Sequence, residues 1–121
     1  MNLLEIFENS GDMLKFPAGT AVFEEGSVGD FMYVVMEGTI RLSLRNEYLA
    51  EASAGGIVGE MALLDSDDRS ATATAITDCV LAPIDLHSFK MLIQHTPDFA
   101  LHVMNVLADR LRSANEKKIA H

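Results

Sequence analysis

The residues best suited to chemistry in this 121-residue chain lie between Gly59 and Ser70. Gly59 is followed by Glu60 and then by good helix formers, 61–64, so a single helical turn can begin here. The first N–H groups of such a turn have no partner within the helix and can bind an anion. Arg69 follows, and a guanidinium can hold a phosphate through two parallel hydrogen bonds. Together with the hydroxyl of Ser70, these groups predict a site for a phosphate-bearing ligand.

A second interpretation of Arg69 involves only its charge. It is the only basic residue within 46–89, a stretch that holds eight acidic residues. Arg69 could therefore neutralise the aspartates of the 65–68 segment in a surface loop, because loop charges usually pair or stay solvated. The small residues that begin at Ala71 would allow a ligand to lie close to the backbone, so both interpretations of Arg69 stay open at this point.

Short strands separated by turn residues are expected to position this segment. The run 39–45 alternates apolar and polar side chains, which is the period of a half-buried strand. Further strands are predicted at 13–16, 20–24, 31–36, 48–52, 71–76 and 79–84. So many short strands at this spacing are typical of a sandwich or barrel.

The pattern becomes helical after Asp85. Phe89 and its neighbours follow helical spacing, and Thr96-Pro97 resembles an N-cap followed by proline at the first helical position. One amphipathic stripe follows at offsets of three and four: Phe99, Val103, Val106, Leu107 and Leu111. Apolar residues among the first seven predict a short N-terminal helix. We expect one domain, 1–121, with a β-roll over about 13–84 and C-terminal helices over about 86–118.

Composition and charge exclude several classes of protein. Nine basic and 18 acidic residues give a net charge of −9, which disfavours binding to nucleic acid or to anionic lipid headgroups. No apolar run approaches the roughly 18 residues of a membrane span. Glu5 and Glu8 stand where a signal peptide would carry positive charge, so a cytoplasmic protein is expected.

Other chemistry-bearing residues are assigned structural roles. The four histidines lie in the helical end and lack the strand positions of a metal site, so no metal is expected. Cys79 lies in an apolar strand and is interpreted as a small buried residue. The basic residues near the C-terminus are expected to be a solvated helix end: Arg110, Arg112, Lys117 and Lys118. No nucleophile, base and orienting residue occur together, so an enzyme is not predicted.

Residues 59–64 (GEMALL), followed after an acidic loop by 69–72 (RSAT), closely resemble the phosphate-binding cassette of cyclic-nucleotide-binding domains. These domains occur in bacterial catabolite activator proteins, kinase regulatory subunits and gated channels. The resemblance extends to 16–19, 23–26 and 31–38, so it covers most of the chain. It implies an eight-stranded antiparallel, jelly-roll-like β-roll flanked by helices, and a non-catalytic sensor of cyclic AMP, with cyclic GMP as a second ligand.

The resemblance also implies roles for individual residues. Glu60 would accept a hydrogen bond from the ribose 2′-hydroxyl, and Arg69 would hold the cyclic phosphate. The other implied ligand-binding residues are Gly59, Met61, Ala62, Ser70 and Ala71, and the implied base contacts are Leu49, Val58 and Asn115. Leu63, apolar and close to the cassette, would link phosphate binding to movement of the C-terminal helices.

This chain departs from the family pattern in two places. Asp68 stands where proline often precedes the arginine, and it adds negative charge beside the anion site. The helix that covers the base in family members is also expected to be shorter here. Ala114 and Asn115 align with family positions that contact the base, and only Asn115 can offer a hydrogen bond. Ser70, common in adenine-selective bacterial members, favours cyclic AMP by several-fold.

Three function classes follow from these observations. The leading hypothesis is a stand-alone nucleotide sensor that signals to a protein partner, with the oligomeric state left open. The alternative is an interaction module that keeps the fold without the ligand; a degenerate cassette should have lost Glu60 or Arg69, and both remain. A transcription factor would need several dozen residues after Arg112, where the sequence continues for only nine, so direct nucleic-acid binding is not expected.

Overall fold

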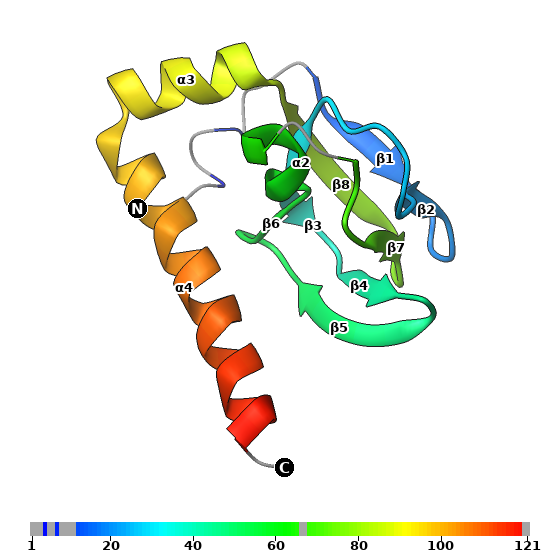
Figure 1. The fold of residues 1–121 in the computed structure, drawn as a ribbon. Coiled ribbons are helices and arrows are strands. Elements are labelled where there is room, and N and C mark those ends of the chain that lie inside the picture. The colour runs from blue at the N-terminus through cyan, green and yellow to red at the C-terminus, as the bar shows by residue number, and fades with distance from the viewer. Residues whose placement is uncertain (1–3, 5–6, 8–11, 66–67, 120–121) are drawn as a thin grey trace.

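The computed structural model describes residues 4, 7, 12–65 and 68–119, with side chains as far as Ser113 apart from that of Asp65. Within these residues, eight short strands form two four-stranded antiparallel sheets (Figure 1). The first sheet has the order β1 (Leu14–Phe16), β8 (Cys79–Ile84), β3 (Met32–Glu37), β6 (Ile57–Val58). The second has the order β2 (Ala21–Phe23), β7 (Thr72–Ala75), β4 (Ile40–Leu44), β5 (Glu47–Ala52).

In the part of the chain that the structure describes, three helices with given bounds accompany the sheets: α2 (Glu60–Asp65), α3 (Leu86–His95) and α4 (Pro97–Ile119). Helix α3 begins at the N-cap Asp85, whose carboxylate accepts a 2.7 Å hydrogen bond from the N–H of Ser88. Thr96 is the C-cap of α3, and α4 begins at once with Pro97, where a proline fits because the first helical N–H needs no partner. Figure 1 shows α3 and α4 on one side of the two sheets. No helix within the described ranges is long and apolar enough to cross a membrane.

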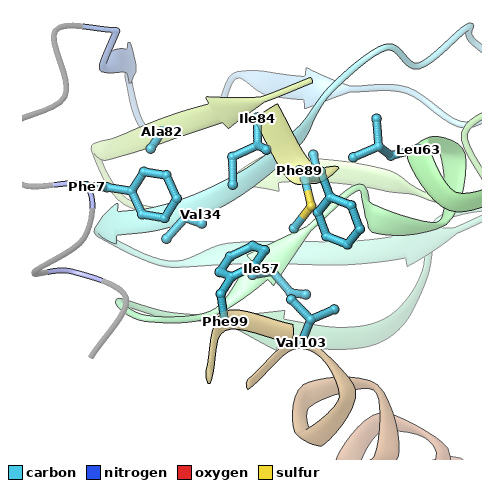
Figure 2. Packing of buried hydrophobic residues seen from close by; sticks show 10 residues of the cluster. Phe7, Val34, Ile57, Leu63, Ala82, Ile84, Phe89, Phe99 and Val103 are labelled. Atoms are coloured by element: carbon cyan, nitrogen blue, oxygen red, sulfur yellow. The ribbon is translucent and has the colours of Figure 1, made fainter. Parts of the chain in front are cut away.

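One apolar cluster joins the helices to the first sheet (Figure 2). Phe99 of α4 is completely buried in this cluster. The centroid of its ring lies 5.7 Å from that of Phe89 of α3 and 6.4 Å from that of Phe7. Leu63 of α2 belongs to the same cluster, as does Val34 of β3. Burial of these side chains fixes α2, α3 and α4 against one face of the roll.

A second cluster is built from both sheets. Its buried members are Val35, Ile40, Ala52, Val58, Ala73, Ala75, Cys79 and Leu81. The prediction that Cys79 is a small buried residue is confirmed, since its side chain is 2 % exposed. The two clusters together hold the strands that carry the cassette.

The antiparallel β-roll with C-terminal helices was predicted correctly, and each of the seven predicted strands is present within one or two residues of its expected bounds. The two-residue strand β6 is not among the strands predicted from the sequence pattern. The stripe on α4 is wrong at its last position: Phe99 and Val103 are buried, whereas Leu111 is 64 % exposed. The helix has by then passed the apolar cluster. The predicted N-terminal helix lies outside the described residues except for Leu4 and Phe7.

Candidate functional site

A cavity of about 520 Å³ lies among β5, α2, the Arg69 segment and the second half of α4. Its size is within the usual range for small-molecule sites. Eight of the residues expected to bind ligand line it: Leu49, Gly59, Glu60, Met61, Ala62, Arg69, Ser70 and Ala71. The chain therefore folds so that two separate segments of the sequence pattern, 59–62 and 69–71, line the same cavity.

Gly59 forms the sharp turn between β6 and α2. Its φ of +81° is unfavourable for other residues, and a Cβ there would come within 2.6 Å of Nη1 of Arg69. The turn directs Glu60, the first residue of α2, into the interior, where it is only 4 % exposed. A carboxylate is rarely buried to this extent without a partner.

Arg69 is fixed first through its backbone. Its N–H donates to Ser27 O at 2.7 Å, and its carbonyl accepts from Gly26 N at 2.9 Å. The side chain then donates from Nη2 to Phe31 O at 2.7 Å and from Nη1 to Gly59 O at 3.1 Å. Arg69 is thus held at both ends by the loop between β2 and β3 and by the cassette turn.

The burial of Arg69 does not fit a residue that neutralises aspartates in a surface loop. The residue is 6 % exposed, and its bonds within the described side chains and backbone go to carbonyls. Burial lowers the pKa of the guanidinium because desolvation penalises the charged form, although Tyr33, Asp30 and Glu60 act in the opposite direction. Among the described residues, the buried Nε has no hydrogen-bond partner. A buried cation with an unpartnered N–H beside a cavity is suited to an anionic ligand.

Glu60 pairs with Arg110, a residue that the sequence analysis expected to be exposed to solvent. Arg110 of α4 donates from Nη1 to Oε1 of Glu60 at 2.6 Å, and from Nη2 to the carbonyl of Ile57. The expectation that Arg110 belongs to a solvated helix end is therefore wrong. Arg112 does lie at the surface, where it pairs with Asp109. An i,i+4 pattern or a charge count within α4 could not have revealed a contact with residue 60.

Of the predicted base contacts, Leu49 lines the cavity and Val58 does not. Val58 is completely buried in the second apolar cluster, because β6 pairs with β3 and directs this side chain between the sheets. Asn115 belongs to α4, but its side chain lies outside the described ones. The cavity has further lining residues that were not predicted: Phe23, Leu42, Tyr48, Ala50, Glu51, Asp109, Arg110 and Ser113.

The sequence of residues 13–96 matches the family model described as "Cyclic nucleotide-binding domain". The chain belongs to the cyclic nucleotide-binding domain family. The match includes the two sheets, the cassette and α3, and it ends just before α4. The part of the cavity formed by Asp109, Arg110 and Ser113 therefore lies beyond the matched residues.

Relatives of this cyclic nucleotide-binding domain include both kinases and bacterial regulators. It is 36 % identical over 83 residues to a cGMP-dependent protein kinase of Drosophila melanogaster, covering 69 % of this chain and 8 % of the kinase. It is 34 % identical over 105 residues to the cyclic AMP receptor protein of Thermus thermophilus, covering 83 % of this chain and 49 % of that protein. The crystal structure of the Thermus thermophilus catabolite activator protein matches with a TM-score of 0.76 and 32 % identity, covering 89 % of this chain and 53 % of that one. The chain thus spans about half, or less, of the relatives' lengths.

Proposed function

We propose that this domain is a non-catalytic sensor that binds cyclic AMP in preference to cyclic GMP and transmits binding to its C-terminal helices. The observation that carries the proposal is the placement of Glu60 and Arg69. Both are more than nine-tenths buried and both line the same cavity. Glu60 offers the hydrogen-bond acceptor that a ribose hydroxyl needs, and Arg69 the cationic donor that a cyclic phosphate needs.

The proposed pose follows from these two side chains. Arg69 and the hydroxyl of Ser70 donate to the phosphate, together with the backbone N–H groups near Met61 and Ala62 at the start of α2. Glu60 accepts from the ribose 2′-hydroxyl. Leu49, 43 % exposed on β5, lies on the cavity wall where the base can pack.

Coupling to the helices is supported by two contacts of α2. Its Leu63 packs in the same cluster as Phe89 of α3 and Phe99 of α4. Its Glu60 is bonded to Arg110 of α4. A ligand whose ribose bonds to Glu60 and whose phosphate draws the cassette inward therefore acts on residues that contact both helices. The coupling requires that the ligand bind one arrangement of α4 more tightly than another.

The proposed preference for cyclic AMP rests on Ser70. The serine side chain lacks the methyl group that restricts the χ1 rotamer of threonine. Its hydroxyl is therefore less firmly oriented to bond a guanine amino group. One unreplaced hydrogen bond is worth about 1 kcal/mol, which gives a preference of several-fold. A protein partner that reads the helix position, and a cytoplasmic location, complete the proposal.

A calorimetric titration of the chain with cyclic AMP and, in parallel, cyclic GMP at one salt concentration tests the function. We expect saturable binding of both, with cyclic AMP several-fold tighter. Cyclic GMP binding about tenfold tighter would overturn the adenine preference. Binding of neither nucleotide would overturn the sensor and favour an interaction module that keeps the fold alone.

A further inference from the structure

Aromatic rings of β2 and β3 lie against the Arg69 guanidinium. Its Cζ is 4.1 Å from the centroid of the Phe23 ring, a distance at which a guanidinium and a ring face attract each other. Tyr33 stacks on Phe23 with centroids 6.3 Å apart and planes 19° from parallel. The Cζ of Arg69 is also 5.9 Å from the Tyr33 ring. Phe23 itself lines the cavity.

Gly29 limits the space for the same guanidinium. A Cβ at Gly29 would come within 2.6 Å of Cζ of Arg69 and even closer to Nε. Real Cβ atoms are not found at such distances, so a side chain at this position would displace the guanidinium. The φ of Gly29 is not among the positive values, so the backbone itself tolerates other residues here. Glycine is therefore required for space and not for conformation.

We propose that Phe23 and Gly29 are positioning residues for Arg69, and that together they set the affinity of the site for a cyclic phosphate. The inference rests on the proposed function and adds two residues that determine the affinity for the ligand. The ring face adds an attraction to the two carbonyl hydrogen bonds of the guanidinium without occupying any further N–H group. An arginine held in one orientation loses less conformational entropy when the anion arrives.

The first test measures the position of Arg69 without any ligand. In proton–nitrogen NMR spectra, side-chain N–H protons over a ring face are shielded, and the Arg69 signal is assigned by its loss in Arg69→Lys. We expect a shielded Arg69 signal that moves toward the position of free arginine in Phe23→Leu. Phe16→Leu is the matched control, because Phe16 packs on the same cluster. An Arg69 signal that Phe23→Leu leaves in place would overturn the proposal.

The second test separates the ring's charge distribution from its shape. Replacing Phe23 by trifluorophenylalanine keeps the packing but removes the negative ring face. We expect this replacement and Phe23→Leu each to weaken cyclic AMP binding by about tenfold, with Phe16→Leu near wild type. Gly29→Ala should weaken it at least as much. Equal affinity of the fluorinated and natural chains would show that Phe23 is only packing and would overturn the proposal.

The two tests also separate this inference from the function on which it rests. If the wild-type chain binds no cyclic nucleotide but the Arg69 signal is shielded and depends on Phe23, the proposed function fails while the positioning of Arg69 by Phe23 stands. If the chain binds cyclic AMP and the signal does not depend on Phe23, the function stands and this inference fails.

Discussion

Arg110 and Glu60, fifty residues apart in sequence, form a 2.6 Å ion pair that joins the last helix to the cassette. The carboxylate side chain is 5 % exposed and the guanidinium side chain 28 % exposed. The proposed ribose acceptor is thus already bonded to α4. Any ligand that bonds to Glu60 must share or replace this contact, so the same carboxylate belongs to the site and to the docking of the helix.

Arg110→Ala should destabilise the protein and loosen α4. Removing one member of a largely buried pair leaves the other without compensation, and we expect a loss of about 2 kcal/mol in the free energy of unfolding. Amide exchange should rise in α4 after Val106. Denaturant unfolding and hydrogen exchange measure the two effects. Arg112→Ala is the matched control, since its pair with Asp109 is exposed and is worth roughly 0–0.5 kcal/mol. Equal behaviour of the two variants would contradict the docking role.

Arg69→Ala should weaken cyclic AMP binding by at least tenfold and leave the protein folded. A charge-assisted hydrogen bond contributes about 1.5–3 kcal/mol, and about 1.4 kcal/mol is a factor of ten. Arg69→Lys should lie between Ala and wild type, because it keeps the charge but loses the planar fork. Calorimetry gives the affinities and circular dichroism the fold. An affinity that does not change in Arg69→Ala would return Arg69 to a purely structural role.

Glu60→Gln should weaken binding less than Arg69→Ala does. The amide oxygen can still accept a hydrogen bond, either from the ribose or from Arg110. A 2′-deoxy analogue of cyclic AMP supplies the complementary change in the ligand. We expect the wild type to bind the 2′-deoxy analogue several-fold more weakly than it binds cyclic AMP. Glu60→Ala should bind the analogue and cyclic AMP with equal affinity. If the wild type does not distinguish the two ligands, the ribose role of Glu60 is wrong.

The N-cap of α3 should make stability depend on pH. The hydrogen bond from the backbone N–H of Ser88 lowers the pKa of the Asp85 carboxyl. Because the folded-state pKa lies below the unfolded value, this contribution is complete above the unfolded pKa of about 4 and is lost as the pH falls through the folded value. Asp85→Ala should therefore lower Tm by a few degrees near neutral pH.

The Asp85 variants also provide the control for that dependence. Asp85→Asn can cap the helix without titrating, so its melting temperature should exceed that of Asp85→Ala at every pH. The advantage of the wild type over Asp85→Ala should shrink as the pH falls below the unfolded pKa of aspartate, about 4, and through the lower folded value. A difference between wild type and Asp85→Ala that stays constant throughout this fall in pH would show that the capping carboxylate does not titrate as described.

Much of the fold could be predicted because its signals are local. Alternation in 39–45 and the turn glycines define strands, and Thr96-Pro97 marks the boundary between α3 and α4. Strand β6 has only two residues, too few for a period, and it is defined by pairing with Tyr33 and Val34. Residue type also could not show that Leu111 is exposed, because that depends on where α4 leaves the apolar cluster.

In the site too, residues close together in sequence could be predicted, whereas residues that reach it from distant parts of the chain could not. The cassette residues from Gly59 to Ala62 and from Arg69 to Ala71 are recognisable because they are consecutive, and they do meet at one cavity. Arg110 and Phe23 could not be recognised, since each contacts the site only through tertiary packing. Val58 was misplaced because burial between the sheets depends on strand pairing and not on proximity to Gly59 in sequence.

The central claim is that a cyclic nucleotide occupies the cavity between Arg69 and Glu60, and a crystal structure of the chain grown with cyclic AMP tests it most directly. The account predicts the cyclic phosphate within hydrogen-bonding distance of the Arg69 guanidinium and the Ser70 hydroxyl, with the ribose 2′-hydroxyl on the Glu60 carboxylate. A nucleotide bound elsewhere, with Arg69 still bonded to the carbonyls of Phe31 and Gly59 and to no phosphate, would contradict it.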